Sequence, residues 1–225
     1  MRLLKGERPF VGAQSIRHHN MQKQNILQSA SRKKKLIYQK DLEDGNVLAS
    51  QPALDTSLFY TIEEIAVLIE ELMEMDAPRD GEGRLLEVRP KGHWFEFEVA
   101  KRLGYNYPPS SGLFPDIRHQ VLEIKHHTGK SITVDFGRYH PGSKEIINET
   151  WNQKLQFQVN QVRYLIALAP PPTYKVATLI LLTGVQIMDV FGVSPKATIK
   201  YQMGISKKWC EEHQGKMLVG ESIWL

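Results

Sequence analysis

The sequence has almost none of the features that mark a disulfide-bonded or a membrane-spanning protein. Cys210 is its only cysteine among 225 residues, so no intramolecular disulfide can form and no paired-cysteine zinc site is present. The longest apolar run, around "VATLILLTGV", is well short of the roughly 20 residues that span a bilayer. The first thirty residues contain no apolar block typical of a secretory signal. We therefore expect no membrane association and a cytoplasmic location.

Several common catalytic signatures are also missing. The sequence contains no glycine-rich loop of the Walker or dinucleotide type, no Gly-x-Ser-x-Gly elbow and no His-Glu-x-x-His helix. His119, His126, His127 and His140 lie close together in the sequence, but their spacing matches no zinc signature. Nucleotide-loop, serine-nucleophile and zinc chemistry are therefore disfavoured.

Charge is distributed unevenly along the chain. Residues 1–40 contain ten Lys or Arg and one acid, a charge of +9, so the other 185 residues carry −5 within the total of +4. This asymmetry is expected when one region contacts a polyanion. The densest run, "SRKKKL", supplies Arg32, Lys33, Lys34 and Lys35 as candidate DNA contacts, although a basic run can also be a solvated face. Residues 1–57 show no sustained periodicity, and we interpret them as a basic arm that orders only against a partner.

The remaining residues, 58–225, have the composition and length of one folded domain. Helical periodicity predicts helices at 61–75, 93–104 and 149–169, the first with a Thr61/Glu64 capping box. Alternating or continuous apolar runs predict strands at 113–125, 131–136 and 174–183, and the tail is expected to add a strand and a short helix. This order predicts an α/β (α+β) fold with a central mixed β-sheet flanked by helices.

The stretch "GLFPDIRHQVLEIKHH" places charged residues inside a strand-like run. Alternation puts Glu123 and Lys125 on one face of the strand and Ile124 on the other. If the chain reverses around residues 119 and 120, Asp116 faces Glu123, with Cβ atoms about 4.5 to 5.5 Å apart. A surface hairpin with a Glu-Lys pair and a turn aspartate is the alternative.

Two carboxylates held this close repel each other unless a proton or a cation lies between them. A hard divalent cation could be held by Asp116, Glu123 and the Ile124 carbonyl, and oxygen ligands of this kind favour magnesium or manganese over zinc. Such an ion acidifies bound water and stabilises charge on a phosphate, while Lys125 can orient or deprotonate that water. The pattern indicates phosphodiester hydrolysis.

These residues resemble the PD-(D/E)XK nucleases, and among them the type II restriction endonucleases. Pro115-Asp116 and Glu123-Ile124-Lys125 match the family motif, and the resemblance covers about residues 90 to 185. It implies a restriction-endonuclease-like core and Mg²⁺-dependent cleavage, with Mn²⁺ as a possible substitute. Asp116 and Glu123 would be metal ligands, Lys125 the catalytic lysine and residues 58–225 the catalytic domain. A homodimer acting on double-stranded DNA is implied as well.

The family often adds an acid from the preceding helix, and Glu96 and Glu98 both qualify. On a helical wheel Glu96 projects with the apolar positions, whereas Glu98 projects with Lys101 and Arg102, which can pair with it. We therefore expect Glu96 to assist at the site and Glu98 to form an ion pair.

Two further regions are candidate DNA contacts beside the basic arm. One is the loop "GRYHPGSK", with Arg138, Tyr139, His140 and Lys144. The other is an amide-rich stripe on the predicted helix 149–169, whose side chains suit base edges but equally suit a solvated face. The stripe consists of Asn152, Gln156, Asn160 and Arg163.

The sequence thus predicts a type II restriction endonuclease. Two alternatives stay open: another nuclease of the same superfamily, acting in repair, junction resolution or mobile-element processing, and a DNA-binding protein without catalysis. The first of these would cut according to DNA structure, and the second would not cut at all.

Overall fold

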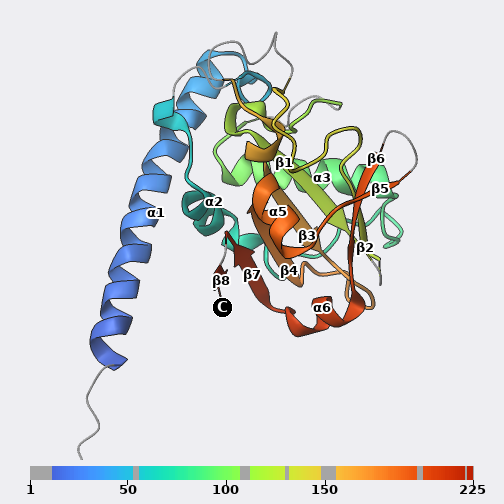
Figure 1. The fold of residues 1–225 in the computed structure, drawn as a ribbon. Helices are drawn as coiled ribbons and strands as arrows, with labels where there is room; N and C mark the ends of the chain where they lie inside the picture. The colour runs from blue at the N-terminus through green and yellow to red at the C-terminus, as the bar shows by residue number, and fades with distance from the viewer. Residues whose placement is uncertain are drawn as a thin grey trace, which may run out of the picture.

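The computed structural model describes residues 12–52, 56–106, 112–129, 132–147, 156–196, 200–220 and 222–224 (Figure 1). Its helices are α1 (Gly12–Glu43), α2 (Ile62–Ile69), α3 (Val88–Arg102), α5 (Gly184–Val190) and α6 (Lys207–Glu212). Short 3-10 helices are η1 (Leu48–Ser50), η2 (Thr56–Leu58), η3 (Glu70–Leu72), η4 (Arg118–Gln120) and η5 (Val159–Gln161). The strands are β1 (Leu122–His127), β2 (Ile132–Asp135), β3 (Arg163–Leu168), β4 (Thr178–Thr183), β5 (Ser194–Lys196), β6 (Lys200–Ile205), β7 (Lys216–Val219) and β8 (Ser222–Trp224). Among the described helices, none is both long and apolar enough to cross a membrane.

The main sheet has five strands in the order β1-β3-β4-β7-β8 and mixes parallel with antiparallel pairs. β1 runs parallel to β3, β3 antiparallel to β4, and β4 parallel to β7. All six residues of β3 are buried, as expected for a strand with neighbours on both edges and cover on both faces. This arrangement confirms the predicted α/β class with a mixed sheet and helices.

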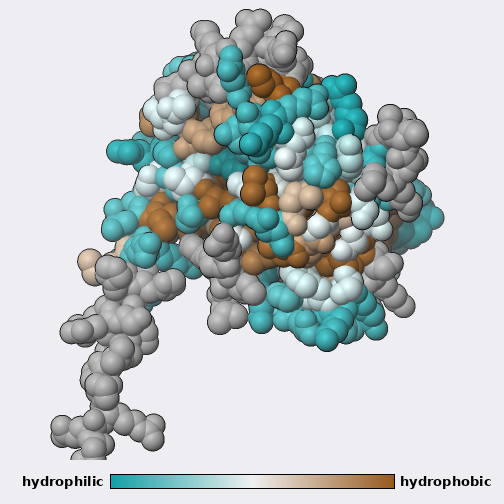
Figure 2. All heavy atoms as spheres, viewed as in Figure 1, coloured by the Kyte–Doolittle hydropathy of each residue, from teal (hydrophilic) through white to brown (hydrophobic). Residues whose placement is uncertain are grey.

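The two faces of the sheet belong to two different apolar clusters. Leu122, Ile124 and Leu165 pack with α1, α2 and α3 on one face. Val121, Tyr164 and Ile166 pack on the other face, under the smaller antiparallel sheet β2-β6-β5 and helix α5. In the space-filling view, the side that carries α5 shows apolar residues in patches between hydrophilic ones (Figure 2). The edge strand β1 therefore lies between the helical layer and the second sheet.

The predicted helix 149–169 is wrong for its described part. Residues 148–155 lie outside the described residues, but the chain from Arg163 to Leu168 forms strand β3 at the heart of the sheet. A short apolar run that is buried on all sides carries no periodicity that separates a helix from a strand. Here the strand is favoured because "RYLIAL" bonds to β1 on one edge and β4 on the other.

The expectation that residues 1–57 lack structure of their own is wrong for residues 12–43. They form the 32-residue helix α1, whose N-terminal end projects from the body (Figure 1). Ala30 and Ile37 are fully buried where α1 packs against α2, so tertiary contact stabilises a helix with a weak sequence signal. The boundary placed between residues 57 and 58 stays a prediction.

The predicted strand 113–125 is wrong for residues 113–121, because the chain turns through η4 there and β1 begins only at Leu122. Several other elements follow the predictions. The Thr61/Glu64 capping box is present at the start of α2, which ends at Ile69 rather than at residue 75. Helix α3 begins at Val88, five residues before the predicted start, and the tail forms β6 and α6 as expected.

Candidate active site

The hairpin that was predicted to bring Asp116 to Glu123 is present. Ile117 and Leu122 exchange both of their backbone hydrogen bonds, with N···O distances of 2.9 and 3.1 Å. Of the four residues between them, Arg118–Gln120 form η4, and the fourth, Val121, follows it with a left-handed φ of 49°. Such a conformation is costly for a β-branched residue and is more frequent at functional sites than elsewhere. The predicted register is therefore confirmed.

Direct hydrogen bonds join Asp116, Glu123 and Lys125. The Asp116 amide donates to Glu123 Oε2 at 3.2 Å, and the Ile124 amide donates to Asp116 Oδ2 at 2.7 Å. Lys125 Nζ donates to Glu123 Oε1 at 2.5 Å. Glu123 is 6% exposed, so the group lies at the edge of the sheet with little access to water. The backbone thus fixes both carboxylates, and the lysine neutralises one of them.

Negative charge is in excess in this group. Burial raises the pKa of Asp116 well above its usual value, and the carboxylates of Glu123 and Glu96 raise it further, which Lys125 only partly offsets. Burial alone would lower the pKa of Lys125, but the charges of Glu123 and Asp116 outweigh it and raise the pKa. Lys125 therefore keeps its proton, but its single positive charge does not neutralise the nearby carboxylates of Asp116, Glu123 and Glu96.

Glu96 and Glu98 on α3 differ as the sequence predicted. Burial raises the pKa of Glu96, and its charge interacts with Glu123 and Lys125, so this side chain lies on the side of the candidate site. Glu98 instead accepts a hydrogen bond from Arg102 at 2.8 Å, one helical turn along. Glu96 therefore adds a third negative charge to the surroundings of Asp116.

The donor atoms fit a hard divalent cation. Asp116 and Glu123 offer carboxylate oxygens, and the raised pKa of Asp116 reflects negative charge that a cation would neutralise. In the part of the chain that is described, no three His, Cys, Asp or Glu side chains come close enough together to hold a metal. Glu96 thus lies near the pair without completing a cluster of three ligands, and two carboxylates would be the protein's acidic ligands.

The basic run on α1 divides into exposed and engaged residues. Arg32 and Lys35 are exposed, and Lys34 is half-buried. Lys33 donates to Glu64 Oε2 at 2.7 Å and to the Phe59 carbonyl at 2.8 Å. Lys33 therefore holds α1 to α2, whereas Arg32 and Lys35 point to solvent.

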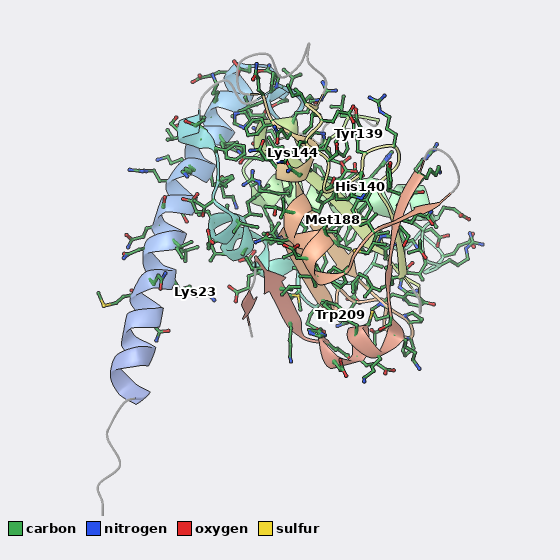
Figure 3. All side chains as sticks on the ribbon, viewed as in Figure 1. Lys23, Tyr139, His140, Lys144, Met188 and Trp209 are labelled. Carbon is green, nitrogen blue, oxygen red and sulfur yellow. The ribbon has the colours of Figure 1, made fainter. Side chains whose placement is uncertain are left out.

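The loop with Arg138, Tyr139 and His140 lies beside the hairpin. The Tyr139 ring stacks on Phe114, two residues before Asp116, with centroids 4.3 Å apart, and the Arg138 guanidinium lies 4.6 Å over the same ring. His140 Nδ1 accepts from the Gly142 amide at 3.1 Å. Tyr139, His140 and the exposed Lys144 lie on the body, away from Lys23 on α1, which pairs with Glu70 at 2.9 Å (Figure 3). The exposed Arg138 guanidinium is thus linked to the candidate site through Tyr139 and Phe114.

The predicted amide stripe does not form one helical face, because residues 156–169 contain only the single-turn 3-10 helix η5 and strand β3. Asn152 lies outside the described residues, Gln156 is exposed with a left-handed φ of 50°, and Asn160 lies in η5. Arg163 is buried in β3 and only 5% exposed, so it does not reach solvent as a DNA contact would.

Arg163 instead supports the turn of the hairpin, a role that the sequence analysis missed. Its guanidinium donates to the carbonyls of Tyr60 and Gln120, and the Gln120 side chain accepts from the Tyr60 amide and donates to the Leu58 carbonyl. A buried charge needs such partners. The one available signal was an arginine inside the apolar run "QVRYLIAL", which suggests a buried polar contact but does not identify its partner.

Comparisons of the chain with models of known protein families, with curated proteins and with solved structures found no match. The site must therefore be interpreted from its own geometry.

Proposed function

We propose that this protein is a magnesium-dependent endonuclease that cuts double-stranded DNA at a short specific sequence, as a type II restriction endonuclease does. The observation that carries the proposal is the hairpin that joins Asp116, Glu123 and Lys125 at one edge of a mixed sheet. Helix α3 with Glu96 on one side and β2 after the hairpin support a restriction-endonuclease-like core.

Each residue has a role that follows from its contacts. Asp116 and Glu123 would hold Mg²⁺, or Mn²⁺ in its place, together with the Ile124 carbonyl, and the bound ion would acidify water and stabilise charge on the phosphate. Lys125 is protonated and hydrogen-bonded to Glu123, so it orients the attacking water and offsets negative charge on the scissile phosphate. Glu96 would accept hydrogen bonds from water at the site.

DNA would approach from the side of the Arg138–His140 loop, because the Tyr139–Phe114 stack joins this loop to the hairpin. We further propose a homodimer, since a two-fold axis would present one site to each strand of a palindromic sequence. We expect the protein to act in the cytoplasm.

The deciding experiment uses purified wild type and Lys125→Ala with long unmethylated DNA from several sources, in Mg²⁺, in Mn²⁺ and in EDTA. We expect discrete fragments from the wild type with either metal, none in EDTA and none from the variant, and sequencing of the fragment ends should give one short motif. Arg84→Ala serves as the control, because Arg84 is exposed and pairs with Asp80 and Glu82.

Other outcomes separate the alternatives. Cutting at junctions or flaps without a shared motif would support a repair or junction nuclease. Intact DNA under all conditions, combined with DNA binding that neither Mg²⁺ nor Lys125→Ala changes, would overturn the nuclease and favour a binding protein.

A further inference from the structure

Tyr164 is the neighbour of Glu123 on the face of the sheet that carries the candidate site. The two residues are paired in the parallel register of β1 and β3. Tyr164 belongs to the same apolar cluster as Val121, two positions before Glu123, whereas Leu122 and Leu165 belong to the opposite cluster. Because side chains alternate along a strand, Tyr164 and Glu123 share one face, and strands in a sheet lie only about 4.8 Å apart.

The Tyr164 hydroxyl is buried without a hydrogen bond. The residue is 0% exposed, and its hydroxyl oxygen has no partner within the described residues. The ring packs edge-on against Phe136, with centroids 5.2 Å apart, a contact that phenylalanine could make equally well. By contrast, the buried Tyr60 hydroxyl donates to the Leu103 carbonyl at 2.9 Å. A buried polar group without a partner is destabilising, so the Tyr164 hydroxyl calls for an explanation beyond packing.

The phenol is a hydrogen-bond donor at neutral pH, where an ordinary tyrosine is protonated. Burial raises the pKa of Tyr164, and the charge of Glu123 raises it further, so the hydroxyl stays protonated. Glu123 already receives Lys125 Nζ on Oε1 and the Asp116 amide on Oε2. Each carboxylate oxygen has a second lone pair, so Glu123 can accept one more donor from the side of Tyr164.

We propose that Tyr164 is a positioning residue that anchors a water molecule against the Glu123 carboxylate through its hydroxyl. The inference rests on the proposed nuclease activity and adds to it the residue that fixes Glu123 from the sheet side. Lys125 fixes the same carboxylate from the strand itself, so the two residues together set its orientation toward the cation. Tyr164 transfers no proton and forms no bond to the substrate.

The test compares Tyr164→Phe with Tyr60→Phe, two buried tyrosines that lose only a hydroxyl. For Tyr164→Phe we expect kcat to fall about 10- to 100-fold and the Mg²⁺ concentration for half-maximal cleavage to rise, as for outer-shell partners of metal ligands. The KM for DNA and the midpoint of urea unfolding should stay close to the wild-type values. For Tyr60→Phe we expect a lower urea midpoint and an unchanged kcat, because that hydroxyl has a structural partner.

Each contrary result has a distinct meaning. An active wild type with an unchanged kcat and Mg²⁺ dependence in Tyr164→Phe would overturn the role of Tyr164 and leave the nuclease intact. A raised KM with unchanged kcat would show that Tyr164 contacts the DNA, and a urea midpoint lowered as in Tyr60→Phe would show a structural role; both overturn the proposal. A wild type that cleaves no DNA would overturn the proposed function and the role of Tyr164 together.

Discussion

Among the described residues, the acidic and basic side chains around Glu64 and those around Asp116 form two buried groups that differ in how their charges are balanced. At the junction of α1 and α2, Glu64 accepts hydrogen bonds from Ser29 Oγ at 2.6 Å, Lys33 Nζ at 2.7 Å and the Thr61 amide at 2.8 Å. Although burial alone would raise the pKa of Glu64, these donors lower it. At the edge of the main sheet, Asp116 and Glu123 share Lys125, and the pKa of Asp116 is raised.

The difference indicates two purposes for buried charge. A carboxylate whose oxygens are all matched by donors stabilises one arrangement of helices and leaves no capacity for a ligand. Carboxylates that outnumber their cations destabilise the protein on their own and become favourable when a cation binds. We therefore interpret the Glu64 group as structural and the Asp116 group as functional.

The largest effect that would test this comparison is expected for Asp116→Asn. The variant should lose cleavage by about three orders of magnitude or more, because a metal ligand and its charge are removed. In the absence of metal it should nevertheless raise the free energy of unfolding at neutral pH by about 1 kcal/mol, because the repulsion with Glu123 and Glu96 is relieved. Cleavage assays and urea unfolding in EDTA measure the two effects.

The added effect of Mg²⁺ distinguishes a functional from a structural role for Asp116. Saturating Mg²⁺ should stabilise the wild type by mass action and should not stabilise Asp116→Asn. If Asp116→Asn were instead destabilised as strongly as a core variant, the carboxylate would be structural, and the contrast with Glu64 would be lost.

The reverse result is expected for Glu64→Gln. Removing the carboxylate leaves the Lys33 ammonium without a counter-charge, and we expect a loss of about 3 kcal/mol in the free energy of unfolding. The folded fraction should cleave DNA with an unchanged kcat, because Glu64 lies at the α1–α2 junction. Glu63→Gln on the same helix is a control, and a kcat that falls with stability unchanged would place Glu64 at the active site instead.

The site was more predictable from the sequence than the fold around it. Glu123 and Lys125 interrupt an apolar strand, and Asp116 is in hairpin register with Glu123, so the pattern lies within a short stretch of sequence. The three side chains lie together in the structure. The Thr61/Glu64 capping box is local as well, and it is present. Patterns of this kind are decided by neighbours within about ten residues.

The features that were missed depend on residues far apart in the chain. β3 is a strand because β1 and β4 bond to it on both sides, and α1 is held by α2, including the Lys33–Glu64 pair. The Tyr164 side chain lies beside Glu123, and the Arg163 guanidinium donates to the Tyr60 carbonyl, and in both cases the two residues are more than 40 positions apart in the chain. Without the tertiary contacts, the apolar periodicity favoured a helix at 149–169, which is wrong for residues 163–168.

Two histidines beyond Lys125 on β1 should make the protein less stable at acid pH, against the opposite and separate contribution of Asp116 and Glu96, whose raised pKa values favour the folded state as pH falls. Burial lowers the pKa of His126 and of His127 to about 4, and nearby positive charge, including Lys91 beside His126 and Lys125 beside His127, adds to the effect. Below about pH 6.5 the unfolded chain binds protons that the folded protein does not. Stability should therefore be fully present above pH 6.5 and fall toward pH 4, by about 2 to 3 kcal/mol for each histidine.

Urea unfolding between pH 7.5 and 4 measures this loss. His126→Phe keeps the stacking on Phe95, where the ring centroids are 5.1 Å apart, and should make the decline shallower by about one proton. The Glu64 group should contribute little in this range, because its lowered pKa delays protonation to lower pH. An equally steep decline in His126→Phe would show that His126 does not titrate in this range.

The smallest effect is expected at the surface beside the site. Arg138 is exposed and lies over Tyr139, which joins the loop to the hairpin through Phe114, so its charge can meet a phosphate. In a Lys125→Ala background, Arg138→Ala should weaken DNA binding similarly for all sequences and reduce the slope of log Kd against log salt by about one. Arg84→Ala should leave that slope unchanged, because Asp80 and Glu82 already match its charge. Equal slopes with and without Arg138→Ala in the Lys125→Ala background would place the bound DNA elsewhere, and the exposed Arg32 and Lys35 of α1 would then be the next residues to change.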